Sequence, residues 1–231
     1  MAGTWIAVGA AGALLALAVA VAVSIRRRAR GRRAGTGEAV ITGSASSTSR
    51  DDLTGAIRSV QTADMFLASD TLEQLWSPEY LERLARAYWR FLSRVTLGLV
   101  HVSYGGGERS IVLLARPLKL LTFRAPEYEL EPLRGLVRWG IARGLLVARR
   151  GRNGGGYLQI EVRRRAEVDA GRAYLHVEIE VANFYPALAS GLGRRFYDVT
   201  QSRIHVVVTH GFLRSLRRLD LAESRVKRLA P

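Results

Sequence analysis

Two stretches of the sequence decide its fold, because apolar and polar residues alternate strictly along each of them. They read Leu158-Gln159-Ile160-Glu161-Val162-Arg163 and Leu175-His176-Val177-Glu178-Ile179-Glu180-Val181. Successive side chains of a strand point to opposite faces, so each stretch predicts a strand with one buried and one solvated face. Asp169-Ala170-Gly171 lies between them and is typical of a turn. The two stretches therefore predict an antiparallel hairpin.

Further strands are indicated on the N-terminal side of this hairpin. Residues 95–104 and 108–115 flank Gly105-Gly106-Gly107, which is a hairpin turn signal. Residues 118–123 and 134–147 are the next apolar segments, and the second contains Gly140 and Gly144. Glycines inside a strand suggest bends or bulges. The region from 95 to 183 thus predicts a curved antiparallel meander.

Two helices are predicted before the meander. Asp51-Asp52 can cap a first helix, because Leu53, Ile57 and Val60 follow at helical spacing. A second helix begins at Ser77-Pro78-Glu79, a cap followed by a first-turn proline and an early acid. Its apolar stripe consists of Leu81, Leu84, Ala85, Tyr88, Phe91 and Leu92.

A long final helix is predicted over residues 192–221, and it is the candidate to cover the apolar face of the sheet. Its broad apolar stripe consists of Phe196, Val199, Ile204, Val207, Val208, Gly211, Phe212, Leu216 and Leu219. The predicted fold class is therefore α+β: an N-terminal transmembrane helix, then an antiparallel β-meander curved around a long C-terminal helix.

The transmembrane helix is predicted over residues 5–25, which carry no charge. At 1.5 Å per residue they span the roughly 30 Å of a bilayer core. A cleavable signal peptide is the alternative, but it would need a basic residue before the apolar stretch. The chain instead begins Met1-Ala2-Gly3-Thr4, and six arginines follow the stretch: Arg26, Arg27, Arg28, Arg30, Arg32 and Arg33.

Arginines are retained on the cytoplasmic side, so we expect a single-pass protein of the bacterial inner (plasma) membrane with its domain in the cytoplasm. The arginines would lie against anionic headgroups. The predicted organisation is an outer N-terminus (1–4), the membrane helix (5–25), a basic juxtamembrane segment and flexible linker (26–50), the α+β domain (51–221) and a basic tail (222–231). The linker prediction depends on the run Gly43-Ser44-Ala45-Ser46-Ser47-Thr48-Ser49.

The meander from Val95 to Asn183, followed by a long closing helix, resembles the START or polyketide-cyclase-like helix-grip superfamily in its element order. The resemblance implies a curved sheet wrapped around the C-terminal helix, with an apolar ligand held between them. It also places Asn183-Phe184-Tyr185-Pro186 at a mouth of the cavity, with Tyr185, Phe196, Tyr197 and Gln201 as candidate ligand-binding residues. A well-packed corner between strand and helix is the alternative interpretation of these residues.

The sequence offers little support for other chemistry. There are no cysteines, so thiolate metal sites and cysteine nucleophiles are excluded. His205 and His210 are five apart, which is not the spacing of a helical metal-ligand pair. His176 beside Glu178 and Glu180 suggests either a weak metal site or a solvated surface histidine. No catalytic constellation is evident, so we expect no enzyme activity, metal or cofactor.

Two functions from different classes remain. The first is a membrane-anchored domain that binds a hydrophobic or lipidic ligand near the membrane surface. The second is a protein–protein interaction or scaffolding module without a ligand cavity. The formal net charge of +15 suggests nucleic-acid binding. Because no recognised motif accompanies this charge, we expect no such partner.

Overall fold

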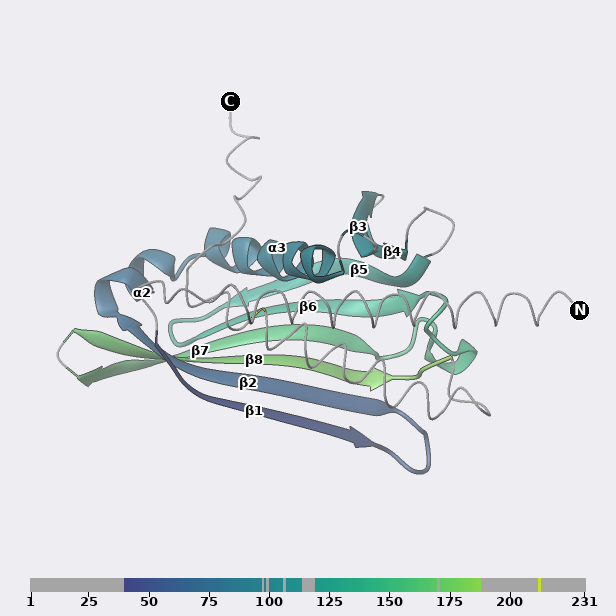
Figure 1. Ribbon diagram of the computed structural model, residues 1–231, viewed down its shortest axis with the longest axis horizontal. Coiled ribbons are helices and arrows are strands. Elements are labelled where there is room, and N and C mark those ends of the chain that lie inside the picture. The colour runs from purple at the N-terminus through teal and green to yellow at the C-terminus, as the bar shows by residue number, and fades with distance from the viewer. Residues whose placement is uncertain are drawn as a thin grey trace, which may run out of the picture.

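The protein is built on one antiparallel sheet of eight strands, seen in a computed structural model that describes residues 40–96, 98, 100–105, 107–113, 119–169, 171–187 and 212. The spatial order of the strands is β1-β2-β8-β7-β6-β5-β4-β3 (Figure 1). The strands are β1 (Val40–Arg50), β2 (Ile57–Ala68), β3 (Val100–Gly105), β4 (Glu108–Leu113), β5 (Lys119–Leu130), β6 (Arg134–Arg143), β7 (Tyr157–Asp169) and β8 (Arg172–Phe184).

Two α-helices among the described residues lie on one face of this sheet. Helix α2 (Ser69–Leu75) packs on β2 and β8, and α3 (Pro78–Val95) packs on β3, β5 and β6 (Figure 1). The predicted start of α3 is confirmed, because the Ser77 hydroxyl accepts a hydrogen bond from the backbone N–H of Tyr80 at 3.2 Å. A short 3₁₀ turn, η1 (Arg149–Gly151), lies between β6 and β7.

The face of the sheet toward the helices, called the inner face here, carries the hydrophobic core. The predicted alternation along β7 and β8 is confirmed on the inner face, where the apolar side chains pack into the core and Leu158 lies opposite Val181. On the other face, which the alternation predicts to be solvated, Gln159, Glu161 and Glu180 are buried as well. The predicted turn signals are confirmed as well: β3 and β4 meet around Gly105–Gly107, and Gly171, at a φ of +81°, joins β7 to β8. The opposite face, called the outer face, carries mostly charged and polar side chains.

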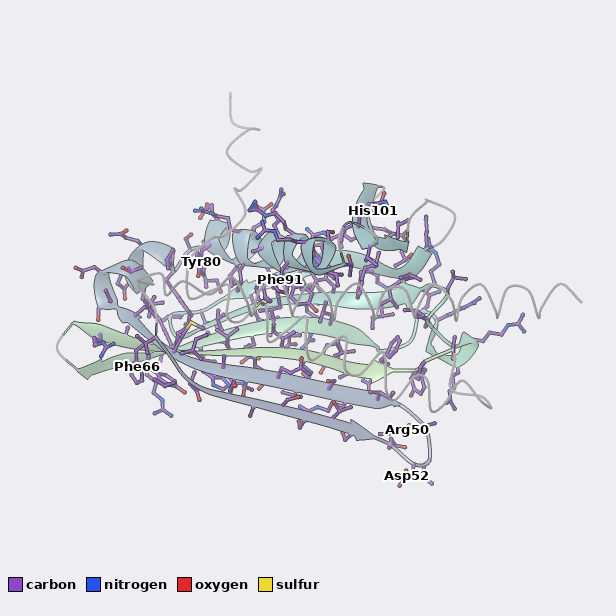
Figure 2. All side chains as sticks on the ribbon, viewed as in Figure 1. Arg50, Asp52, Phe66, Tyr80, Phe91 and His101 are labelled. Atoms are coloured by element: carbon purple, nitrogen blue, oxygen red, sulfur yellow. The ribbon has the colours of Figure 1, made fainter. Side chains whose placement is uncertain are left out.

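The predicted linker is wrong over residues 40–50, and the predicted first helix is wrong, because a hairpin occupies their place; residues 26–39 lie outside the described residues. Residues 40–50 form the edge strand β1, and β2 begins at Ile57. Asp51 caps a turn between them, accepting hydrogen bonds from the backbone N–H groups of Leu53 (3.0 Å) and Thr54 (2.6 Å). Figure 2 shows Arg50 and Asp52 at this turn, at the far end of the hairpin from Phe66. The described domain therefore already includes residues 40–50.

The predicted fold class also needs correction. In the described residues the sheet is covered by α2 and α3, which precede the meander, and not by a C-terminal helix. Of the predicted helix over 192–221, only Phe212 lies within the described residues; it is helical and fully buried. The structure is an eight-stranded antiparallel sheet with helices on its inner face.

The prediction of a single-pass transmembrane protein is corrected too. No helix within the described residues is long and apolar enough to cross a membrane. The predicted span, 5–25, and the six arginines Arg26, Arg27, Arg28, Arg30, Arg32 and Arg33 lie outside the described residues, as does the tail 222–231.

Candidate ligand-binding site

An aromatic cluster lies between α3 and the inner face of the sheet. The predicted stripe of α3 is buried as expected, apart from the partly buried Leu92, and Trp89 is buried with it. Trp89 packs edge-on against Trp139 of β6, with ring centroids 5.2 Å apart, and contacts Phe123 of β5 at 5.4 Å. Tyr88, Trp89, Phe91, Phe123, Trp139 and Phe212 together form the aromatic cluster.

Phe212 joins a distant part of the sequence to this cluster. Its ring lies 5.3 Å from that of Tyr88 and 6.4 Å from that of Phe91. Both partners belong to α3, on which Phe91 is marked in Figure 2. The contacts show that a residue of the predicted C-terminal stripe packs against the helix that covers the sheet.

Two hydrogen-bond donors inside the aromatic cluster have no acceptor among the described residues. The indole nitrogens of Trp89 and Trp139 are buried and have no hydrogen-bond partner among the described residues. Trp89 is 2% exposed and Trp139 is fully buried, so bulk water does not reach either ring. A buried tryptophan usually donates its N–H to an acceptor. Simple core packing does not require two neighbouring tryptophans whose N–H groups both lack an acceptor.

A positive charge lies next to these indoles. The guanidinium carbon of Arg109, on β4, is 5.8 Å from the centroid of the Trp139 ring. Its position over the ring face is that of a cation–π interaction. This part of the interior therefore combines two N–H donors and a cation, and it favours a hydrogen-bond acceptor or a negative charge.

A second polar position lies on the same inner face, on β2. Gln61 is fully buried, and its side-chain nitrogen donates to the hydroxyl of Ser59 at 2.8 Å. Its carbonyl oxygen, Oε1, is buried and accepts no hydrogen bond from the described residues. The Ser59 hydroxyl in turn lies 3.1 Å from that of Thr48 on β1. The unpaired group on Gln61 is thus a hydrogen-bond acceptor, whereas those on Trp89 and Trp139 are donors.

The candidate residues predicted from the sequence lie elsewhere or outside the described part. Tyr185 follows β8 and packs on η1, where the guanidinium of Arg150 lies 5.1 Å from its ring centroid. Its carbonyl accepts a hydrogen bond from the N–H of Ala148 at 2.8 Å. These contacts fit the alternative of a packed corner. Phe196, Tyr197 and Gln201 lie outside the described residues.

His176 belongs to a separate polar cluster on the outer face. Its Nδ1 is 2.6 Å from Oδ1 of Asp64 on β2, and the same oxygen accepts a hydrogen bond from the hydroxyl of Tyr174. Burial raises the pKa of Asp64, but the hydrogen bonds from Tyr174 and His176 outweigh it, so that the pKa is lowered overall. Among the described residues no group of three or more metal-ligating side chains is present. His176 therefore lies beside Asp64 in a hydrogen-bonded cluster on the outer face.

Comparison with known proteins adds little to this geometry. No protein-family model and no curated protein sequence matches the chain. Solved structures with some likeness include CalU16 from Micromonospora echinospora: its solution structure shows 14% identity, 86% of this chain and 84% of that chain covered, and a TM-score of 0.32. The CalU16 crystal structure is 10% identical over 74% of this chain and 93% of that chain, with a TM-score of 0.22. An uncharacterised protein from Rhizobium leguminosarum is 10% identical over 66% of this chain and 98% of that chain, with a TM-score of 0.24. Likeness at such TM-scores carries no argument about fold or function.

Proposed function

We propose that this domain binds an apolar ligand between the inner face of the sheet and the helices, as helix-grip domains do. The order of elements supports this assignment. One strand, β2, is followed by the two helices α2 and α3 and then by the six-stranded meander β3–β8. The meander returns to β2, because β8 pairs with it along its whole length. Strand β1 adds an outer edge to this arrangement.

The observation that carries the proposal is the pair of buried indole N–H groups in the aromatic cluster. Leaving a buried polar group without a partner costs about 1 to 3 kcal/mol. Two such groups, on rings that pack against each other, represent a sizeable fraction of the roughly 5 to 15 kcal/mol by which a domain is stable. A bound molecule that carries an acceptor would remove this cost.

The residues around the two indoles indicate that the remainder of the ligand is apolar. Most of the inner face around them is apolar, with Leu158, Ile160, Val177 and Ile179 at most 3% exposed. A ligand placed there would exchange water for hydrocarbon and aromatic contacts, which contributes about 25 cal/mol for each Å² of apolar surface buried. A mainly hydrocarbon or aromatic ligand with one polar group fits this environment.

Native mass spectrometry of the full-length chain tests the proposal. We expect a discrete mass above the 25.5 kDa of the polypeptide, lost when the protein is extracted with organic solvent. Adding the extract back should restore the mass and change tryptophan fluorescence. Trp76 provides the matched control: its indole already donates to the carbonyl of Glu131 at 3.0 Å, so Trp76→Phe should leave binding unchanged. If no apolar molecule copurifies or rebinds, the interaction-module function should replace this one.

A further inference from the structure

The two unpaired polar positions of the inner face lie at opposite ends of one line of residues. Trp139 on β6 pairs with Leu158 on β7, Leu158 with Val181 on β8, and Ser59 on β2 comes next. Gln61, whose amide contacts Ser59, stands at the β2 end of this line. Three strand spacings of about 4.8 Å separate β6 from β2, so the two ends are about 14 Å apart.

The line between the two ends is apolar. Leu158 and its inner-face neighbours Ile160 and Ile179 are buried, and Val181 packs against the core. At the β6 end, the indoles of Trp89 and Trp139 offer N–H donors beside the cation of Arg109. At the β2 end, Oε1 of Gln61 offers an acceptor. The two ends therefore favour different chemical groups.

We infer that the ligand is an elongated hydrocarbon chain with a carboxylate at one end and a hydroxyl at the other, an inference that rests on the proposed ligand-binding function. The carboxylate accepts hydrogen bonds from Trp89 and Trp139 and faces the positive charge of Arg109. The hydroxyl donates to Gln61. The methylene chain crosses β7 and β8 along Leu158 and Val181, and its length spans the separation of about 14 Å between the two ends.

Calorimetry with three probes on the full-length protein, after removal of any copurified ligand, tests this inference. The probes are dodecane, dodecanoic acid and ω-hydroxydodecanoic acid. Each hydrogen-bonding end group should strengthen binding about tenfold, because each satisfies protein groups that are otherwise left unpaired. We therefore expect the hydroxy acid to bind most tightly and dodecane most weakly.

Two substitutions should remove the two preferences separately. Trp139→Phe keeps an aromatic ring but removes an N–H donor, so it should reduce the advantage of dodecanoic acid over dodecane about tenfold. Gln61→Leu keeps a side chain of similar size without the amide, so it should abolish the advantage of the hydroxy acid over dodecanoic acid. Circular dichroism should match that of the parent protein for each variant, and Trp76→Phe should leave both preferences intact.

The possible failures are distinguishable. If all three probes bind with equal affinity, or if the substitutions leave the preferences unchanged, the inferred end groups are wrong while the apolar-ligand function stands. If no probe binds and no molecule copurifies with the chain, both the inference and the proposed function are wrong. If a rigid aromatic ligand copurifies and the three chains do not bind, the function stands and the elongated ligand is wrong.

Discussion

Glu161 shows how a carboxylate is held on the outer face of the sheet. Its side chain is 5% exposed, since Arg134 and Arg163 lie over it. It accepts hydrogen bonds from Nε of Arg134 at 3.0 Å, Nε of Arg163 at 2.5 Å and the amide of Gln159 at 3.1 Å. Burial raises the pKa of Glu161, but the two arginines outweigh it and lower the pKa overall.

Replacing this carboxylate should destabilise the domain in a pH-dependent way. We expect Glu161→Gln to lower the free energy of unfolding by about 1 to 3 kcal/mol at pH 7, because both arginines lose a charged acceptor. The pKa of Glu161 in the folded protein is below its ordinary value of 4.5. Its stabilising effect is therefore full above pH 4.5 and is lost as the pH falls through the folded pKa. Urea unfolding curves at a series of pH values measure both effects.

The matched control is Glu127→Gln, which changes an exposed glutamate on β5, two strands away from β7 in the sheet. Its free energy of unfolding should stay within about 0.5 kcal/mol of that of the parent protein. An equal loss in both variants, or a difference for Glu161→Gln that persists undiminished at low pH, would contradict the assigned role of Glu161.

Single residues also mark the limit of sequence-based prediction of the candidate site. Burial of Trp89 follows from its place beside Ala85 and Tyr88 on the apolar stripe of α3. A tryptophan in an apolar run indicates a polar N–H that needs a partner. That Trp89 meets Trp139 depends on how α3 crosses β6, which no local pattern contains. The predicted Tyr185 lies in a corner where short-range packing on η1 decides its position.

At the scale of elements, β1 and β2 show why a strand can be missed. An edge strand pairs on one side only, and the small polar residues of β1 bury little surface, so its sequence is that of a linker. Along β2 the inner-face residues include Ser59 and Gln61, while Val60 and Phe66 lie on the outer face. Polar residues at buried positions hide the two-residue period, so Leu53, Ile57 and Val60 suggested a helix. The patterns of β7 and β8, with apolar residues at every inner-face position of the alternating stretches, predict both strands correctly.

The bend after β6 depends on a glycine. Gly144 has a φ of +148°, and a Cβ atom there would lie 2.2 Å from the carbonyl oxygen of Leu120. We expect Gly144→Ala to lower the free energy of unfolding by more than about 2 kcal/mol, because the backbone of β5 cannot yield as a flexible side chain does. Thermal and urea unfolding measure the change.

Gly105 at the end of β3 is the control for this prediction. A Cβ there meets nothing within 4 Å, so Gly105→Ala should change the free energy of unfolding by less than about 0.5 kcal/mol. If Gly144→Ala is as well tolerated as Gly105→Ala, the bend does not need glycine and the close approach to Leu120 is relieved by movement of the strand.

At the scale of the whole molecule, the fold explains why a ligand would sit beside α3. Helix α3 contacts β3, β5 and β6, at the end of the sheet where the chain curls toward it (Figure 1). The indoles lie at this contact, and Gln61 lies across the sheet on β2. A long-range arrangement of this kind joins residues from distant parts of the sequence, so it follows from topology and not from a motif.

The indole N–H resonances of the full-length protein in a ¹H–¹⁵N correlation spectrum test the central claim most directly. The sequence has four tryptophans, and Trp89→Phe, Trp139→Phe and Trp76→Phe assign three of the four signals, which leaves the fourth to Trp5. On titration with dodecanoic acid, the Trp89 and Trp139 signals should move downfield as their N–H groups gain an acceptor, while the Trp76 signal stays in place because it already donates to Glu131. Unchanged Trp89 and Trp139 signals at saturating probe, or an equal shift of the Trp76, Trp89 and Trp139 signals, would contradict ligand binding at this site.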